Sequence, residues 1–184
     1  MADSNLYTAF EGNDWMTTAD LASVLKTVKA HGPESVLLFE ERTGKQCDFD
    51  FRGTLAEILA RIHPPTPKPG PGRPKLGVLS REISLLPRHW QWLELQPHGA
   101  SAALRRLVDL GIQNDSGATE FRLAVEALGK IMTAIAGNQE GFEEAMRHLY
   151  AHRFEELKAL IAQWPGGIRT YVKKRLAVIS CMPQ

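Results

Sequence analysis

The sequence predicts an α+β protein that is mostly helical, with a small α/β N-terminal unit, a central strand followed by two helices, and a C-terminal helical bundle. Apolar residues recur at helical spacing through most of the second half, short apolar runs near the start suit strands, and a proline-rich stretch lies between. With 184 residues, 43% of them hydrophobic, the chain can bury a core. We place the unit, a linker, the strand–helix–helix segment and the helical domain at residues 1–63, 64–75, 76–112 and 117–181.

The N-terminal unit is expected to contain three strands. Residues 6–10 form one, and residues 35–40 and 46–51 flank a turn, which predicts a hairpin. Asp48 and Asp50 share one face of the last strand. Paired carboxylates can carry out acid–base chemistry, but no helper residue is placed beside them, so we interpret them as a solvated strand face.

Two helices are expected in the same unit. Thr17 or Thr18 can cap a helix that ends at Gly32, where the following proline prevents its continuation. Thr54 can cap the second helix, which carries apolar residues at helical spacing.

The linker, PPTPKPGPGRPK, holds six prolines, which exclude helix and sheet and favour an extended chain. Within it, Gly72-Arg73-Pro74 is similar to the core of an AT-hook, a short segment that lays arginine into the minor groove of A·T-rich DNA. This resemblance implies that Arg73 and Lys75 contact DNA. The alternative is a linker with two incidental charges.

The segment after the linker begins with an alternating pattern that is typical of a strand with one buried face. The mostly apolar face carries Leu79, Arg81, Ile83 and Leu85, and the polar face carries Ser80, Glu82 and Ser84. A shift of one residue in register would exchange the two faces. Whether Arg81 or Glu82 points outward therefore stays open.

Two helices should follow this strand. Pro87 suits the first turn of a helix that buries Leu93 and ends before Gly99. Ser101 is expected to cap the second helix, and Gly111 to close it. The second helix should bury Leu104, Leu107 and Val108 and turn Arg105 and Arg106 outward.

This strand–helix–helix segment resembles the ribbon-helix-helix superfamily, which includes the Arc, MetJ and CopG repressors. The residues that carry the resemblance are Ile83-Ser84-Leu85, Pro87, Leu93, Gly99, Ser101, Leu104 and Leu107. In that family two copies pair their strands antiparallel and place the ribbon in the major groove, while amides at the start of the second helix hold a phosphate. The resemblance implies a homodimer with DNA as its partner.

The same resemblance implies which residues contact DNA. Ser80, Glu82 and Ser84 would face bases, and the amides near Ala100 and Ser101 would face a phosphate. With the linker cations and the outward arginine, the expected set is Arg73, Lys75, Ser80, Glu82, Ser84, Ala100, Ser101 and Arg105. Glu82 departs from the family, which usually places a basic or amide side chain there, although a carboxylate can accept a hydrogen bond from cytosine.

Charge is distributed unevenly along the chain, although the total is only +1. Residues 1–63 carry 6 Lys and Arg against 10 Asp and Glu, a net charge of −4, and residues 64–112 carry 7 against 3, a net charge of +4. Because phosphate contact depends on local charge, this distribution favours DNA binding by the central segment.

The C-terminal domain is expected to be all-helical. Its helices should span residues 119–136, 140–151, 152–164 and 168–178. Short connections favour antiparallel neighbours, and we interpret the domain as a bundle that stabilises a dimer. The alternative is a sensor domain with a small-molecule effector. In that case the effector would contact Phe121, Met132, Phe142, Met146 and Trp164.

Evidence for other chemistry is weak. Glu144, His148 and His152 stand at i, i+4 and i+8 and could hold zinc, but we interpret them as a solvated helix face. Cys47 and Cys181 have no spacing partner, no apolar run is long enough to span a bilayer, and no signal-peptide pattern is present. We expect a cytoplasmic protein without cofactor, metal or membrane partner.

The whole arrangement is also similar to a bacterial protein family of unknown function, which joins a short α/β piece to a GRPK-led segment and a helical tail. The matching residues are Tyr7-Thr8-Ala9-Phe10, 72–75, 85–92 and 100–108. This resemblance spans most of the chain and implies no particular activity.

The leading hypothesis is a dimeric DNA-binding protein that regulates transcription. The alternative is a protein-interaction module, either antitoxin-like or a scaffold, without intrinsic DNA binding. An enzyme is the least favoured class, because no nucleophile with a base, cofactor fingerprint or strong metal motif can be identified.

Overall fold

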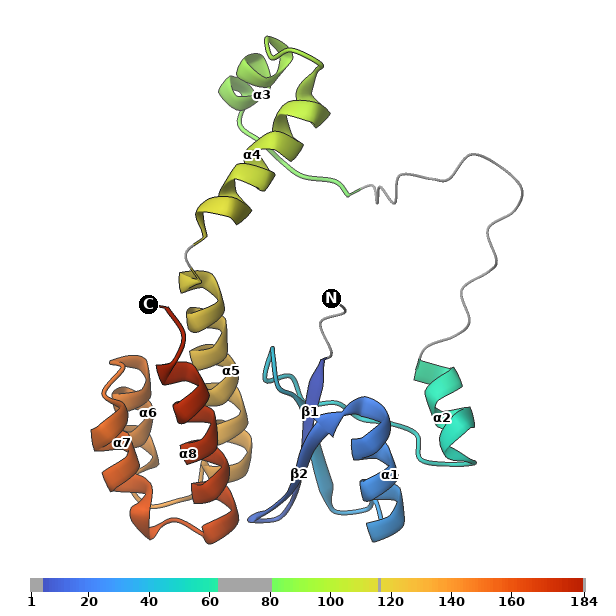
Figure 1. Cartoon of the computed structure of the whole chain (residues 1–184), viewed down its shortest axis with the longest axis vertical. Coiled ribbons are helices and arrows are strands. Elements are labelled where there is room, and N and C mark those ends of the chain that lie inside the picture. The colour runs from blue at the N-terminus through green and yellow to red at the C-terminus, as the bar shows by residue number, and fades with distance from the viewer. Residues whose placement is uncertain (1–4, 63–80, 116, 184) are drawn as a thin grey trace. The chain divides into compact units, whose positions relative to one another are not determined.

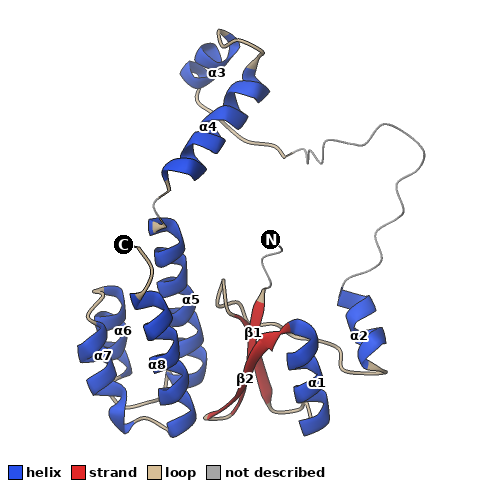
Figure 2. Ribbon diagram, in the orientation of Figure 1, coloured by secondary structure: helices blue, strands red, loops and turns tan. Residues whose placement is uncertain are grey.

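The computed structural model describes residues 5–62, 81–115 and 117–183. The chain forms two compact units, one made of residues 1–64 with 117–184 and the other of residues 65–116. Among the described residues, all strands lie in the first unit, while helices occur in both (Figures 1 and 2). The expected class, α+β and mostly helical, is confirmed.

A three-stranded antiparallel sheet is the centre of the first unit (Figure 2). The central strand β1 (Leu6–Glu11) lies between β2 (Asp14–Asp20) and β3 (Val36–Glu40). Strands β1 and β3 confirm two of the three expected strands. A tight turn joins β1 to β2, and Gly12 begins it with a φ of 55°, a value that favours glycine.

Strand β2 occupies residues that the sequence analysis assigned to a helix start. Thr17 and Thr18 pair with β1 instead of capping a helix. The cap of α1 (Leu21–His31) is Asp20, whose Oδ1 accepts the amide hydrogen three residues further on at 3.1 Å. The cap assignment was wrong because threonine suits both strands and caps, and only pairing with β1 distinguishes them. The expected stop at Gly32 is confirmed.

The expected strand over residues 46–51 does not form. Its contact with β3 is a single bridge between Phe39 and Gln46. Beyond the bridge, Phe49 and Phe51 pack in the apolar clusters around α1. The chain leaves the sheet because burial of these two rings against a helix replaces further pairing with the strand.

Local polar contacts hold the chain between the sheet and α2 (Leu55–Ile62). Asp50 accepts hydrogen bonds from the exposed Arg52 guanidinium, with 2.8 Å between Oδ2 and Nη2, and these bonds hold the pKa of Asp50 well below its usual range. The expected cap at Thr54 is confirmed as a reciprocal capping box, in which the Thr54 amide donates to Glu57 and the Glu57 amide donates to the Thr54 hydroxyl.

The C-terminal part confirms the four expected helices, with small differences at their ends. They are α5 (Ala118–Ala136), α6 (Phe142–Tyr150), α7 (Phe154–Leu160), which continues as a 3₁₀ turn over Ile161–Gln163, and α8 (Gly166–Ser180). Phe121, Met132 and Trp164, which the sensor alternative placed around an effector, are buried in the main apolar core.

The sheet is covered on both faces, by α1 on one side and by α5–α8 on the other (Figure 1). Phe10 and Phe39 pack into the helical core, and the Phe10 ring centroid lies 4.9 Å from that of Tyr171 in α8. Ala9 and Leu38 pack on α1. Residues 1–62 and 117–183 therefore share one core, whereas the sequence analysis treated them as separate domains. The second apolar face of the sheet must also be buried, and helices that are distant in the sequence bury it.

One buried charge lies where the sheet meets α8. Glu41 is only 4% exposed, and its Oε2 lies 2.8 Å from Nε of Arg175, close enough for an ion pair although not aligned as a hydrogen bond. Its Oε1 accepts a hydrogen bond from the Tyr171 hydroxyl at 3.0 Å. Burial raises the pKa of Glu41 above its ordinary value, and the charge of Arg175 opposes part of that rise.

We expect Arg175→Met to lower the free energy of unfolding at pH 7.5 by about 3–5 kcal/mol, because it leaves a buried carboxylate without its counter-charge. The pKa of Glu41 is raised in the folded state. The stability linked to it is therefore complete below the ordinary carboxyl pKa and is lost as pH rises through the folded value. The variant raises that pKa further, so its deficit should shrink between pH 7.5 and pH 5.

Urea unfolding at the two pH values measures this deficit. Lys173→Met is the control, because Lys173 is an exposed cation of the same helix. A deficit in Arg175→Met that is equal at both pH values would contradict the assignment to the charge of Glu41.

Candidate nucleic-acid interface

The segment that was expected to bind DNA forms two helices in the second unit (Figure 1). They are α3 (Pro87–Glu94) and α4 (Ala100–Asn114), and both lie where the sequence predicted helices. Pro87 occupies the first turn of α3, as expected, and Leu93 is buried.

The start of α4 differs from the expected one. Its N-cap is Gly99, not Ser101, and no side chain caps it. Gly99 has a φ of 81°, a left-handed value that favours glycine. A serine in this conformation would be strained. Ser101 instead lies exposed in the first helical turn. The helix also continues through Gly111 to Asn114, because nothing at Gly111 forces a left-handed conformation.

This start leaves backbone donors available. The amides of Ala102 and Ala103 both donate to the Gly99 carbonyl, at 3.2 and 3.1 Å. The amides of Ala100 and Ser101 lie at the very start of the helix, where no preceding helical turn provides a carbonyl acceptor. The two positions expected to face a phosphate therefore present amides at the positive end of the helix dipole.

The residues of the linker and strand that were expected to contact DNA are only partly described. Arg73, Lys75 and Ser80 lie outside the described residues. Glu82 and Ser84 are exposed, and residues 81–86 form no ladder within the single chain. In the ribbon-helix-helix arrangement the strand pairs only with the strand of a second copy, so a single copy would show no pairing. The ribbon therefore stays a prediction.

The described part of the second unit buries few apolar side chains. Over residues 81–115 only Leu93 and Ala103 are buried. A hollow of about 280 Å³ between α3 and α4 has an almost entirely apolar lining, which includes Leu85, Trp92 and Leu107. Large apolar side chains of this segment are exposed to solvent, namely Ile83, Leu86, Trp90, Trp92, Leu95, Leu107, Val108, Leu110 and Ile112.

Charge is balanced over the described part of this segment. Residues 81–115 carry 4 Lys and Arg against 4 Asp and Glu. Arg105 is exposed on α4, as expected, and Nη2 of Arg106 lies 3.4 Å from Oε1 of Gln96. Of the net charge of +4 in residues 64–112, residues 64–80, which include Arg73 and Lys75, carry +3.

The histidine and carboxylate residues weighed as a zinc site do not come together. On α6, Nε2 of His148 lies 3.4 Å from Oε1 of Glu144. His152, however, lies beyond the end of that helix, with a φ of 57°. Its ring lies edge-on to Phe121, with centroids 4.8 Å apart. Among the described residues, no group of three His, Cys, Asp or Glu side chains is arranged to hold a metal ion.

A family model described as an uncharacterised protein conserved in bacteria (DUF2239) matches residues 6–177, a span that runs through both units. The chain belongs to this family. No curated protein and no solved structure shows detectable similarity to the chain. Within the part of the chain that the structure describes, no helix of this DUF2239 protein combines the length and apolar character needed to cross a membrane.

We expect Gly99→Ala to destabilise the α3–α4 hairpin by about 1 kcal/mol, because alanine must adopt a φ of 81° there. Gly111→Ala is the matched control. Gly111 lies inside α4, where an added Cβ meets nothing within 4 Å, so alanine should stabilise the helix by about 0.5–1 kcal/mol. Amide hydrogen exchange of α4 in the full chain measures both changes, and shifts of the same sign would contradict the cap assignment.

Proposed function

We propose that this protein is a dimeric DNA-binding protein that regulates transcription, and that its central segment forms a ribbon-helix-helix dimer. The observation that carries the proposal is the exposed apolar surface of α3 and α4. Only two side chains of residues 81–115 are buried, which is too small a core for a hairpin that folds alone. A second copy is the occupant that the resemblance implies.

A second copy would complete both parts of the segment. Two copies of the predicted strand would pair antiparallel and satisfy each other's backbone groups. The apolar face of this ribbon, which includes Ile83 and Leu85, would cover the helices of both copies. The hollow lined by Trp92 and Leu107 then lies in the dimer core rather than in solvent.

Three features support DNA as the ligand of this dimer. The amides at Ala100 and Ser101 suit a phosphate. Glu82 and Ser84 are exposed on the segment that would form the ribbon, where carboxylate and hydroxyl groups can bond to base edges. Because residues 81–115 are electrically balanced, the attraction to phosphate comes from the preceding arm with Arg73 and Lys75.

The dimer is tested first, because the DNA site depends on it. Ile83→Glu with Leu107→Glu should convert a dimer into a monomer in sedimentation experiments, since both side chains are exposed in one copy but would be buried between two. Gln91→Glu with Gln113→Glu adds the same charge at exposed polar positions and should leave the dimer intact. Dimers in both variants would contradict the proposed interface, and a monomeric parent protein would contradict the proposal.

DNA binding is tested by the linker cations. Arg73→Ala with Lys75→Ala should weaken binding to random genomic fragments about tenfold or more at low salt and reduce the steepness of the salt dependence by about two charges per protomer. Arg153→Ala with Lys173→Ala removes two exposed cations from the first unit and should change neither quantity.

Two results would separate the alternatives. Parent-like affinity and salt dependence in the linker variant would remove the arm from the DNA site. Recovery of one stoichiometric protein partner with no binding to genomic fragments would favour an antitoxin-like or scaffold module instead.

A further inference from the structure

Two hollows of the first unit lie where the end of β3 meets α5 and α8. One has a volume of about 260 Å³ and the other of about 90 Å³. Both are lined by the same five residues, namely Glu41, Arg42, Glu120, Arg175 and Met182. The smaller hollow also borders Leu123 and Ala124 of α5, and the larger one Asn5 and Leu6. Because they have most of their lining in common, the hollows are two parts of one cavity, called the Arg175 cavity below.

Arg175 is fixed in the wall of this cavity by Glu41. Its Nε lies 2.8 Å from Oε2 of Glu41, and its Nη2 donates to the Glu41 carbonyl at 3.3 Å. The Glu41 side chain is only 5% exposed, and the Tyr171 hydroxyl holds its other oxygen. The guanidinium is therefore ordered by the fold, and little further ordering is needed when a ligand binds to it.

The outer edge of the same guanidinium has unused donors. A guanidinium carries five N–H groups, and here only Nε and one hydrogen of Nη2 are directed at Glu41. Within the described residues Nη1 makes no hydrogen bond, and unlike Nε it is not shielded from solvent. The edge formed by Nη1 and the second hydrogen of Nη2 can therefore donate to a ligand. Its planar fork matches the two oxygens of a carboxylate.

The cavity also offers a negative group and an apolar wall. Glu120 lies exposed in the first turn of α5, and no cation of the described residues forms an ion pair with it. Its carboxylate can accept hydrogen bonds from an ammonium group. With Glu41, Arg42 and Arg175, Glu120 gives the lining two charges of each sign, so the cavity favours a ligand that carries both charges over a net anion. The apolar wall comes from Leu6, Leu123, Ala124 and Met182.

We propose that the Arg175 cavity binds a free α-amino acid with an apolar side chain. The carboxylate of the ligand accepts from the outer edge of Arg175, and its ammonium group donates to Glu120. Its side chain packs on Leu123, Ala124 and Met182. The larger hollow, at about 260 Å³, is below the roughly 300–1,000 Å³ of pockets for drug-sized ligands, which suits a ligand of this size. The site shares none of the residues that the sequence analysis assigned to an effector.

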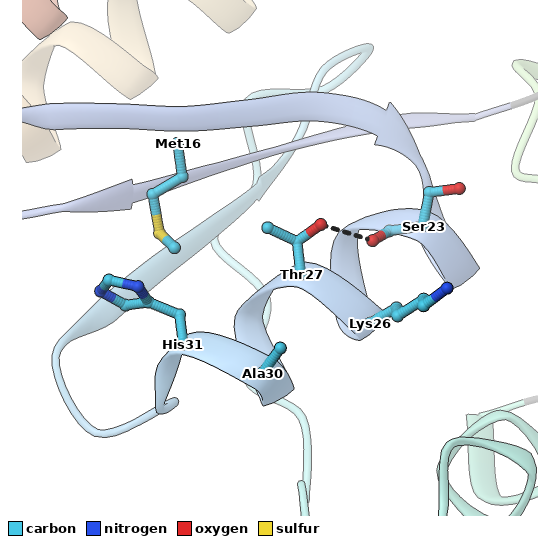
Figure 3. Close-up of a pocket in the computed structure, with 6 residues that line it drawn as sticks. All are labelled: Met16, Ser23, Lys26, Thr27, Ala30 and His31. Atoms are coloured by element: carbon cyan, nitrogen blue, oxygen red, sulfur yellow. Dashed lines mark hydrogen bonds between the residues drawn. The ribbon is translucent and has the colours of Figure 1, made fainter.

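A hollow between β2 and α1 lacks such a fixed charge (Figure 3). It has a volume of about 590 Å³ and is shallow. Lys26 and His31 line it, but both are exposed, and the Glu11 side chain that pairs with His31 is itself 42% exposed. No buried group therefore orders a side chain there for a ligand. Met16 lines this hollow and points toward the helix, so it can report on binding outside the Arg175 cavity.

Calorimetric titration of the full chain at pH 7.5 tests the ligand, with leucine and methionine as probes. At least one of them should bind with a Kd below about 1 mM. Two analogues of leucine are the matched controls, because leucinamide lacks the carboxylate and 4-methylpentanoate lacks the ammonium group. Each should bind about tenfold or more weakly than leucine, since one charged group of the site is left without its partner. No binding of either amino acid, or an analogue that binds as tightly as leucine, would overturn the proposal.

The site is located with variants of the full chain. Glu120→Gln should weaken amino-acid binding about tenfold or more, because it removes the charge opposite the ammonium group. Glu156→Gln is its control, an exposed glutamate in the first turn of α7. Arg175→Lys keeps a positive charge beside Glu41 but lacks the outer fork, and it should weaken binding at least as much. Arg169→Lys, the same change in α8, should have no effect.

Methyl NMR of methionine places the ligand independently of these variants. Bound amino acid should shift the Met182 methyl signal and leave that of Met16 unchanged, because only Met182 lines the Arg175 cavity. Parent-like affinity in Glu120→Gln, which does not disturb the buried ion pair, or an unchanged Met182 signal would overturn the proposal. None of these measurements involves DNA, so their outcome is independent of the proposed function.

Discussion

The first unit depends on the burial of the sheet between α1 and the C-terminal helices. Phe10 and Phe39 point into the same core as Tyr171, so the two ends of the sequence must come together before either is stable. If helices covered only one face of the three-stranded sheet, these rings would be exposed to water, at a cost of about 1.5–3 kcal/mol for each. Glu41, paired with Arg175 in the same contact, adds a charge that is tolerated only while the two parts stay packed.

The described part of the central segment is not part of this core. Residues 65–116 lie in the chain between two parts of one folded unit, and they form a unit of their own. The segment does not contribute to the main core, and α3 and α4 bury little against each other. Its exposed apolar side chains are not part of the core that the sheet and the C-terminal helices share.

The sequence by itself determined the elements whose signals are local. Helical periodicity placed α3 to α8, Thr54 began α2, and Gly32 ended α1. For the candidate site, it predicted the two helices and the exposure of Arg105, but assigned their junction to Ser101. The φ at Gly99 depends on how the turn closes between the helices, which no single residue type reveals.

Only the tertiary structure decided the features that depend on distant residues. Thr17 and Thr18 suit a cap as well as a strand, and pairing with β1 assigned them to β2. Phe49 and Phe51 have the alternation of a strand, yet they pack on helices once α1 and α2 are in place. The union of the sheet with α5–α8 joins residues more than a hundred positions apart. Sequence periodicity shows that each element has an apolar face, but it carries no information about which other face will cover it.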